Sequence, residues 1–313
     1  MARPDGACPT VILAPGAADD LLVALGAKTT FAAGDGPLAV ACSGGPDSTA
    51  LAVLAARTGR HVTLHHVNHG LRQGAVEDAR FVRSLAQLLD VDVVVHEVSI
   101  HATSNLEEEA RLARFGVMPR DVATAHTMDD QAETVLLNLL RGAGTTGLGA
   151  MAPGPRHPIL ALRRSETHEL CEQLGLVTAI DETNEDPRFA RNQVRSQLIP
   201  LLAAISNRDP VPLLDRTARL ARADAELLDA LSAQSIHDPT DVALLRAAPL
   251  PLASRALRSW LAAERSTQAA PHPPSEAEIE RILRVVRGEV VATEIHGGAR
   301  VARTDGRLRL EQG

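Results

Sequence analysis

The first two thirds of the chain alternate between short strand-like runs and segments with helical periodicity. Runs rich in β-branched and apolar residues occupy positions 38–42, 62–67, 91–98 and 122–125. Helical spacing of apolar residues follows each run, at about 48–58, 75–89, 105–116 and 128–141. Strands that alternate with helices of about 10–15 residues form βαβ units, in which neighbouring strands run parallel. The sequence therefore predicts an α/β fold with a doubly wound parallel sheet.

The last third of the chain has a different pattern and predicts a smaller, mainly helical domain. Helical periodicity runs from residue 193 to about residue 231 and is interrupted near 207–212, where we place the domain boundary. Further along, the pair Asp305-Gly306 lies between short alternating runs and indicates a terminal β-hairpin. We therefore expect a larger α/β domain over residues 1–206 and a smaller, mainly helical domain over residues 207–313.

The first strand-like run ends in a glycine-rich turn, after which a helix is expected. The turn reads Ser43-Gly44-Gly45-Pro46-Asp47-Ser48. Paired glycines let the backbone turn tightly and bring N–H groups against an anion. The helix N-terminus adds free N–H groups and the positive end of the helix dipole, and the serines add hydroxyl donors. The turn therefore predicts a phosphate site, in which Asp47 requires Mg²⁺ or a cationic group beside it.

Other features of the sequence exclude several classes of protein. No apolar run reaches the roughly 18 residues of a membrane span, and the N-terminus lacks a basic segment that leads into an apolar stretch. The cysteines Cys8, Cys42 and Cys171 lie far apart. This spacing argues against a zinc site, an iron–sulfur cluster or a disulfide framework, and it fits a reducing cytosol. We expect a cytoplasmic protein that does not interact with a membrane.

Charge is spread unevenly along the chain, whose formal net charge is −7. Residues 188–222 carry seven arginines against two aspartates. A local stripe of this kind can bind phosphates even in an acidic protein. A solvated helix face with some ion pairs has the same composition, so charge alone leaves both interpretations open. Aromatic residues make up only 2% of the chain, which disfavours nucleic-acid binding through stacking platforms.

The motifs in this sequence resemble those of a known family. The turn at 43–48 resembles the PP-loop of N-type ATP pyrophosphatases, which cleave ATP between its α- and β-phosphates. Further segments are similar to the tRNA(Ile)-lysidine synthase family, namely 66–72 (HVNHGLR), 105–107 (NLE), 124–134 (TAHTMDDQAET), 141–144 (RGAG), 181–184 (DETN) and 191–195 (RNQVR). One departure is Thr127, which stands where most members carry a second histidine. The short C-terminal part resembles the compact form of the family. The resemblance implies that residues 1–206 form the PP-loop catalytic domain and that residues 207–313 bind the tRNA substrate.

The resemblance implies a reaction and its substrates. In this family, ATP with Mg²⁺ activates C2 of the wobble cytidine in an isoleucine tRNA with a CAU anticodon, and pyrophosphate leaves. The ε-amine of free L-lysine then attacks the adenylated tRNA, and AMP leaves. A free lysine amine has a pKa of about 10.4, so at neutral pH it is protonated and cannot attack. The site therefore needs carboxylates that hold the ammonium group and take its proton.

The resemblance and the spacing of acidic residues together suggest which side chains do this. Asp130 and Glu133 are three residues apart at the start of an expected helix, hence on one face, and Asp47 approaches from the turn. We expect these acids to hold lysine, and Asp47 and Asp130 to bind Mg²⁺. Arg191 and Arg195, four residues apart, are expected to neutralise charge at the α-phosphate or the tRNA backbone. The expected nucleotide-binding residues are Ser43, Gly44, Gly45, Pro46, Asp47, Ser48, His126 and Arg111.

Two other interpretations come from different classes of protein. A PP-loop tRNA thiolase would need paired cysteines, and an amidotransferase would need a glutaminase domain with a nucleophilic cysteine. A non-catalytic ATP-binding module would need the phosphate loop but not the surrounding acids and arginines. The sequence favours the ligase over both alternatives. It does not determine the oligomeric state, for which a homodimer is one option.

Overall fold

The computed structural model describes residues 18–31, 33–68, 75–98, 116–178, 189–265 and 273–311. The chain divides into two compact units, Met1–Arg219 and Leu220–Gly313. Each unit has a hydrophobic core of its own. Helix α10 (Pro210–Ser235) runs through the division, and the sequence-based boundary after residue 206 lies just before this helix.

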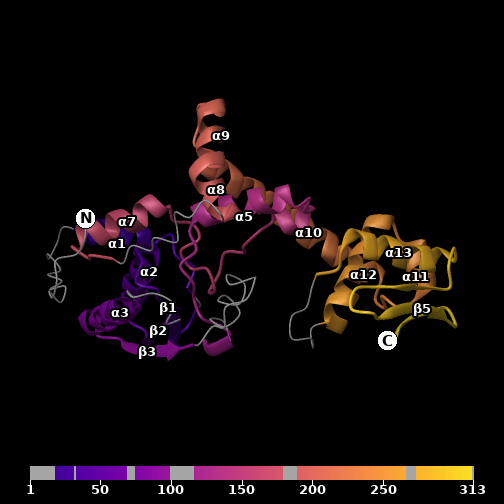
Figure 1. Ribbon diagram of the computed structural model, residues 1–313, viewed down its shortest axis with the longest axis horizontal. Coiled ribbons are helices and arrows are strands. Elements are labelled where there is room, and N and C mark those ends of the chain that lie inside the picture. The colour runs from indigo at the N-terminus through magenta and orange to yellow at the C-terminus, as the bar shows by residue number, and fades with distance from the viewer. Residues whose placement is uncertain are drawn as a thin grey trace. The chain divides into compact units, whose positions relative to one another are not determined.

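The first unit contains a parallel sheet with the strand order β1-β2-β3 (Figure 1). Its strands are β1 (Leu38–Ala41), β2 (Val62–Asn68) and β3 (Asp92–Glu97). On the other side of β1, Ala123 forms a single parallel bridge with Val40, where the sequence predicts a fourth strand. The chain thus builds the sheet from β1 to β3 and then returns to the opposite side of β1. This reversal is a topological switch point, the place where open α/β sheets bind ligands.

The helices of the first unit follow the predicted alternation. They are α1 (Asp19–Gly26), α2 (Pro46–Ala56), α3 (Ala75–Leu89), α5 (Met128–Leu140), α6 (Thr145–Leu148), α7 (Arg164–Gln173), α8 (Ala190–Gln193), the π-helical turn η2 (Val194–Leu198) and α9 (Ile199–Ser206). Residues 48–55 of α2 are all buried, because α2 packs against β1 and β2 as well as α1 and α7 (Figure 1). The predicted α/β fold is confirmed, while the helix expected at 105–116 lies almost wholly outside the described residues.

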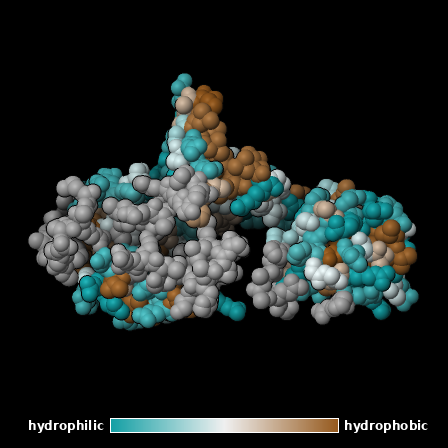
Figure 2. Space-filling model, in the orientation of Figure 1, coloured by the Kyte–Doolittle hydropathy of each residue, from teal (hydrophilic) through white to brown (hydrophobic). Residues whose placement is uncertain are grey.

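Helix α9 is an apolar helix that the rest of its unit does not cover. None of its residues is buried, and Leu201 and Ile205 are 54% and 73% exposed. Figure 2 shows this as a hydrophobic surface over α9. Asn207 ends the helix in the left-handed conformation, so the predicted interruption is short and α10 begins at Pro210. Within the described ranges, no helix has both the length and the apolar character needed to cross a membrane.

The second unit is mainly helical, as predicted. It contains the end of α10, then α11 (Val242–Ala247), α12 (Leu250–Arg265), α13 (Glu276–Arg287) and the antiparallel strands β4 (Ala292–Glu294), β5 (Arg300–Thr304) and β6 (Arg307–Glu311). Its core buries Trp260, Leu257 and Ile282. Because Trp260 is the one tryptophan of the chain, its fluorescence reports on this unit alone.

The predicted hairpin lies at the end of this unit. Strands β5 and β6 pair from Arg300↔Glu311 to Thr304↔Arg307, and the two residues between them have positive φ angles, 50° at Asp305 and 76° at Gly306. Two positive φ angles define the type I′ turn that an Asp-Gly pair favours. The sequence therefore predicts this hairpin correctly, and β4 adds a third strand beside β5 that the pattern did not predict.

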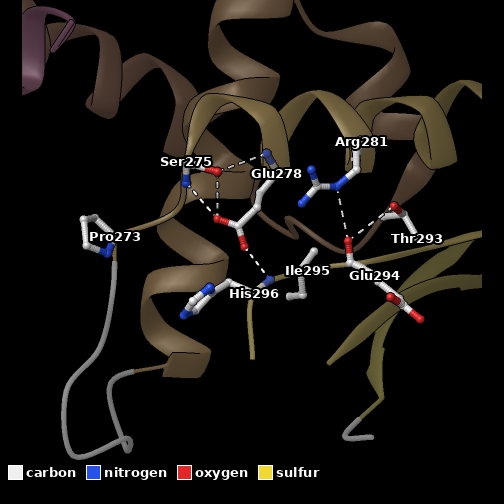
Figure 3. Close-up of a pocket in the computed structure, with 8 residues that line it drawn as sticks. All are labelled: Pro273, Ser275, Glu278, Arg281, Thr293, Glu294, Ile295 and His296. Atoms are coloured by element: carbon white, nitrogen blue, oxygen red, sulfur yellow. Dashed lines mark hydrogen bonds between the residues drawn. The ribbon is translucent and has the colours of Figure 1, made fainter. Parts of the chain in front are cut away.

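A buried ion pair fastens α13 to α12 in the second unit. Glu278 is 4% exposed, and one of its carboxylate oxygens accepts hydrogen bonds from Arg265 Nη2 at 2.6 Å and from the His296 amide at 2.9 Å. The other oxygen accepts from the amide and hydroxyl of Ser275, which closes a capping box at the start of α13 (Figure 3). Burial alone would raise the pKa of Glu278, but these donors lower it to about 2.

Replacing Glu278 with Gln should therefore destabilise the second unit in a pH-dependent way. A carboxylate whose folded-state pKa is lowered from 4.5 to about 2 adds stability above pH 4.5 and loses it as the pH falls toward 2. We expect Glu278→Gln to lower the free energy of unfolding at pH 7 by on the order of 2–3 kcal/mol, because Arg265 also loses its charged partner. Urea unfolding followed by Trp260 fluorescence measures this difference.

The matched control is Glu280→Gln, since Glu280 is exposed on the same helix. This variant should unfold like the wild type to within about 0.5 kcal/mol. Equal stability of Glu278→Gln and wild type at pH 7, or a gap that does not narrow below pH 4.5, would contradict the prediction.

Candidate active site

The predicted site residues converge at the topological switch point of the first unit. The PP-loop turn, residues 43–48, leaves the end of β1 and enters α2. Residues 124–127 follow the bridge at Ala123 on the other side of β1 and lead into α5. Because both segments leave neighbouring positions of one sheet edge, the N-termini of α2 and α5 come close together.

The PP-loop turn is closed by the hydroxyl of Ser48. Its Oγ accepts hydrogen bonds from the amides of Ser43 and Gly44, both at 3.2 Å, and donates to the Gly45 carbonyl oxygen at 2.9 Å. Gly44 has a φ of 91°, a conformation that glycine adopts without steric cost. Pro46 occupies the first turn of α2, as expected. Ser48 is buried, so in this arrangement it holds the loop together and is not directed toward solvent.

The N-terminus of α5 positions Asp130 through a capping box. One oxygen of Asp130 accepts hydrogen bonds from the amide of Thr127 at 2.8 Å and from its hydroxyl at 2.9 Å. Thr127 is fully buried, and Asp130 is 8% exposed. The threonine that replaces the second histidine of the family pattern therefore orients Asp130 and has no exposed surface for a substrate.

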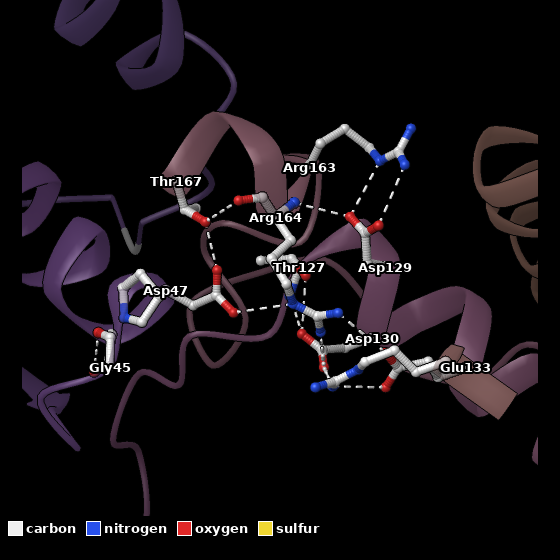
Figure 4. A network of polar contacts seen from close by, with 12 residues as sticks. Gly45, Asp47, Thr127, Asp129, Asp130, Glu133, Arg163, Arg164 and Thr167 are labelled. Carbon is white, nitrogen blue, oxygen red and sulfur yellow. Dashed lines mark hydrogen bonds and ion pairs between the residues drawn. The ribbon is translucent and has the colours of Figure 1, made fainter. Parts of the chain in front are cut away.

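The predicted acids Asp47, Asp130 and Glu133 form one cluster around Arg164 (Figure 4). Arg164 is the first residue of α7, and its Nε lies 3.4 Å from Asp47 Oδ2. Its two terminal nitrogens lie 2.9 Å from Asp130 Oδ1 and 3.2 Å from Glu133 Oε1. The hydroxyl of Thr167, one turn further along α7, donates to the other oxygen of Asp47. One arginine thus joins the acid of the PP-loop to the acids of α5.

Glu133 is enclosed by arginines. Its side chain has no exposed surface, and its oxygens accept from Arg191 Nε at 2.7 Å, from Arg195 Nε at 2.7 Å and Nη2 at 3.2 Å, and from Arg164. Arg191 also lies 3.2 Å from Asp130 Oδ1. The structure therefore brings all five predicted catalytic residues together. Each oxygen of Glu133 accepts from two guanidinium N–H groups, so this carboxylate holds the arginines, and its contact with lysine stays a prediction.

The two aspartates differ in the direction of their pKa shifts. Burial raises the pKa of Asp47, and its contacts with Thr167 and Arg164 offset this only in part. Burial would also raise the pKa of Asp130, but Arg164, Arg191 and the Thr127 amide lower it below the ordinary value. Asp130 is therefore the carboxylate that stays firmly ionised. Burial would lower the pKa of Arg164, but the three carboxylates raise it, so this guanidinium stays charged.

His126 belongs to a second polar group beside this cluster. The hydroxyl of Thr124 lies 2.8 Å from His126 Nδ1 and 2.9 Å from His157 Nδ1, and it donates to the Arg156 carbonyl oxygen at 2.9 Å. Burial, together with the charges of His126 and Arg156, lowers the pKa of His157 to about 4, so this imidazole is neutral at physiological pH. The position of His126 is thus set by Thr124 and His157, neither of which the sequence indicated as a site residue.

Arg164 is a site-forming residue that sequence reasoning missed, and Arg163 precedes it outside the cluster of three acids. Cations at a helix N-terminus are disfavoured by the helix dipole, so two consecutive arginines at the start of α7 signal acidic partners nearby. Arg163 forms ion pairs with Asp129 and Asp209, while Asp129 also accepts from the Arg164 amide at 2.8 Å. The predicted Arg111 lies outside the described residues.

The arginine-rich stretch does not form one surface. Arg191 and Arg195 face the acids of α5 from α8 and from the π-helical turn η2. Arg216 and Arg219 lie exposed on α10, where Arg219 pairs with Asp215 at 3.4 Å. The exposed arginines of α10 are therefore candidates for contact with a phosphate backbone.

The acids do not form a metal-binding group of the usual kind. Among the described residues, no three His, Cys, Asp or Glu side chains are placed to hold a metal ion. Arg164 fills the space between Asp47 and Asp130, and the remaining oxygen of each accepts a hydrogen bond from a threonine. As arranged here, the two aspartates do not fit a Mg²⁺ site, and their role as metal ligands stays a prediction.

A glycine-rich turn between a strand and a helix, at the switch point of a parallel sheet and surrounded by acids and arginines, is typical of a PP-loop protein. The family model for the PP-loop domain matches residues 24–202, and the model for the TilS substrate binding domain matches residues 241–313. A tRNA(Ile)-lysidine synthase from Mycolicibacterium paratuberculosis is 40% identical over 268 residues, which cover 81% of this chain and 83% of that one. The synthase of Mycobacterium tuberculosis is 36% identical, with coverage of 87% and 90%. The chain therefore belongs to the tRNA(Ile)-lysidine synthase family, as its motifs predicted, and to the ATP-dependent ligases of the PP-loop class.

A solved structure with the same fold comes from a different branch of the class. The U34-tRNA thiolase NcsA from Methanococcus maripaludis, solved with its [4Fe-4S] cluster, superposes with a TM-score of 0.52. The match covers 65% of this chain and 80% of the thiolase, at 16% identity. At this identity the similarity supports the fold and not a shared reaction.

Removing the buried carboxylate of Glu133 should destabilise the first unit. The Gln side chain has nearly the same size, but Arg191, Arg195 and Arg164 would lose the negative charge at their centre. Breaking a buried ion network in this way costs about 3 kcal/mol, so we expect Glu133→Gln to melt at a clearly lower temperature. Thermal unfolding followed by far-UV circular dichroism measures the change, while Trp260 fluorescence monitors the second unit separately.

The control for this prediction is Glu169→Gln, because Glu169 is exposed on α7. It should melt within about 2 °C of the wild type, since surface substitutions usually change stability by less than 0.5 kcal/mol. A melting temperature for Glu133→Gln as high as that of the control would show that the arginines do not depend on this carboxylate.

Proposed function

We propose that this chain catalyses the ATP-dependent ligation of free L-lysine to C2 of the wobble cytidine in an isoleucine tRNA with a CAU anticodon. ATP adenylates the C2 oxygen and pyrophosphate leaves. The ε-amine of lysine then attacks C2, its extra proton passes to a carboxylate, and AMP leaves with the C2 oxygen. A reaction on tRNA places the protein in the cytoplasm.

The observation that carries this proposal is the cluster of three carboxylates and three guanidinium groups beside the PP-loop (Figure 4). The reaction needs cationic groups where phosphates gather and carboxylates where an ammonium group must lose its proton. Both kinds of group are present in one cluster at the switch point. An ATP-binding module without catalysis needs only the first kind.

The nucleotide half of the site is the PP-loop with the arginines. Residues 43–48 lie at the N-terminus of α2, whose N–H groups and dipole favour a phosphate. Arg191 and Arg195 are 37% and 31% exposed at their side chains, so they can turn toward the α-phosphate or the tRNA backbone. Mg²⁺ enters this half with ATP, whose phosphates are the usual partners of this ion.

The amine half of the site is Asp130. Its lowered pKa keeps it ionised, so it can pair with the ε-ammonium group and hold the amine in position for attack. Asp47 belongs to the PP-loop and faces Asp130 across Arg164, so it lies where the two halves of the site meet. Glu133 acts through the other two arginines of the cluster.

The thiolase alternative is disfavoured by the two described cysteines. Cys42 and Cys171 are both buried. Burial raises the pKa of Cys42 to about 11 and that of Cys171 to about 12. Sulfur transfer needs a reactive thiolate, which such thiols do not supply at neutral pH.

A single incubation tests the proposed function. Purified protein is mixed with ATP, Mg²⁺ and radiolabelled lysine, together with transcripts of the isoleucine tRNA with a CAU anticodon or of the elongator methionine tRNA with the same anticodon. We expect label to enter only the isoleucine tRNA, and only when ATP is present. Label in both tRNAs, or in neither, would overturn the proposal.

Neutralising the two aspartates should separate the half-reactions. Asp130→Asn removes the charge that holds the ammonium group, so the KM for lysine should rise about ten- to a hundredfold while tRNA-dependent release of pyrophosphate continues. Asp47→Asn, beside the PP-loop, should instead lower pyrophosphate release itself. Rapid-quench assays of pyrophosphate release and lysine incorporation distinguish the two variants.

The control for both is Asp92→Asn, since Asp92 is exposed on the edge strand β3. It should leave both half-reactions at the wild-type rate. If Asp130→Asn lost pyrophosphate release as fully as Asp47→Asn, the proposed division of the site into two halves would be wrong.

The arginines of α10 provide a test for the tRNA surface. We expect the triple variant Arg216→Ala, Arg219→Ala and Arg222→Ala to raise the KM for tRNA and to flatten its salt dependence by about one unit of log–log slope per lost phosphate contact. The KM for lysine should barely change, because lysine binds in the acidic cluster. Steady-state kinetics at several salt concentrations give these slopes.

A triple variant with the same charge change serves as the control. Arg57, Arg80 and Arg83 are exposed on or beside α2 and α3, and their replacement by Ala should leave the salt slope unchanged. An unchanged slope in the α10 variant would place tRNA on another surface.

A further inference from the structure

Arg164 makes contacts that set it apart from the other arginines of the cluster (Figure 4). Each of its three guanidinium nitrogens faces a different carboxylate, at 3.4 Å from Asp47, 2.9 Å from Asp130 and 3.2 Å from Glu133. Arg191 and Arg195 reach only the acids of α5. Among the ion pairs of the described residues, only those of Arg164 therefore join the PP-loop acid to the α5 acids.

The charges of the cluster cancel, and Arg164 is needed for that balance. Three carboxylates, Asp47, Asp130 and Glu133, face three guanidinium groups. The side chain of Arg164 is the least exposed of the three arginines, at 20% against 37% for Arg191 and 31% for Arg195. It is thus the cation in the interior of the cluster, while the other two close it from the outer side.

Arg164 binds the oxygens of Asp47 and Asp130 that the threonines leave available. The second oxygen of Asp130 is taken by Thr127, and that of Asp47 by Thr167. Their remaining oxygens face Arg164. A substrate ammonium group that binds between Asp47 and Asp130 must therefore replace N–H groups of Arg164, because among the described ion pairs this guanidinium alone contacts both carboxylates.

We propose that Arg164 is a specificity-determining residue for the amine substrate. In the substrate-free protein, the Arg164 guanidinium occupies the cation position that the ε-ammonium group of lysine takes over. This inference rests on the proposed function, which supplies lysine as the substrate. The longest of the three contacts, from Arg164 Nε to Asp47 at 3.4 Å, is the one that an incoming ammonium group replaces most easily. Arg164 thereby keeps the acids in position for an amine before the amine arrives.

This role has a consequence that a purely structural role does not have. Without the charge of Arg164, the cluster carries one net negative charge. A cation then binds to it more tightly and an anion more weakly. The affinities for lysine and ATP should therefore move in opposite directions, whereas a distorted or partly unfolded site would lose affinity for both ligands.

The experiment compares binding constants by isothermal titration calorimetry. Lysine is titrated in the presence of α,β-methylene-ATP, which cannot be cleaved at the reacting bond, and this analogue is titrated alone. For Arg164→Gln we expect the Kd of lysine to fall by about fivefold and that of the analogue to rise by about fivefold. Arg164→Lys restores the charge but not the planar fork, so both constants should return toward those of the wild type.

The neighbouring Arg163 provides the matched control. It precedes Arg164 at the start of α7 but pairs with Asp129 and Asp209 and not with the three acids. Arg163→Gln loses the same charge on the same helix, and it should leave both Kd values within about twofold of the wild type. Opposite shifts in Arg164→Gln with none in Arg163→Gln would support the assignment.

The other outcomes are distinguishable. Weaker binding of both ligands in Arg164→Gln, or an unchanged Kd for lysine, would overturn the role of Arg164 and leave the proposed function standing. The same opposite shifts in Arg163→Gln would also overturn it, because they would reflect net charge at a distance. Absence of lysine binding in the wild type, even with tRNA present, would overturn the proposed function and this inference with it.

Discussion

A fully buried carboxylate cannot remain ionised without compensating charge, and in this protein Glu133 receives that charge from three arginines. The arginines come from α7, α8 and η2, so the requirement to neutralise one side chain of α5 fixes how these helices meet. Asp47 joins the same network through Arg164 and connects it to the PP-loop. Ion pairs therefore connect the segments of the site, which lie far apart in the chain.

The same network divides the site by charge. Asp130 is held ionised by its arginine and threonine partners, whereas burial raises the pKa of Asp47. Two carboxyl groups whose pKa values shift in opposite directions suit two tasks, because one can hold a cation while the other lies beside an anion. The switch point of the sheet places both next to the phosphate loop. The proposed two-step ligation uses this separation, with ATP on one side and the amine on the other.

The second unit is stabilised by a separate core and a separate buried ion pair. Arg265 and Glu278 join α12 to α13, and the core around Trp260 shares no residue with that of the first unit. The substrate-binding family model covers most of this unit. The PP-loop family model thus falls within the first unit and the substrate binding model within the second.

Local sequence determined the elements of this protein, and the tertiary structure decided which of their side chains meet. Periodicity predicted the three strands and the helices between them. Residues close in sequence predicted the PP-loop turn, the position of Asp130 and Glu133 on one helix face, and the Asp305-Gly306 hairpin. The fourth strand proved to be a single bridge at Ala123, since pairing depends on a neighbour that periodicity does not specify. Arg164 escaped prediction because its partners Asp47 and Glu133 lie 117 and 31 residues away. Ion pairs across such separations leave no periodic signal. Only the tertiary structure, in which α7 packs against α2 and Arg164 reaches the acids of α5, brings these charges together.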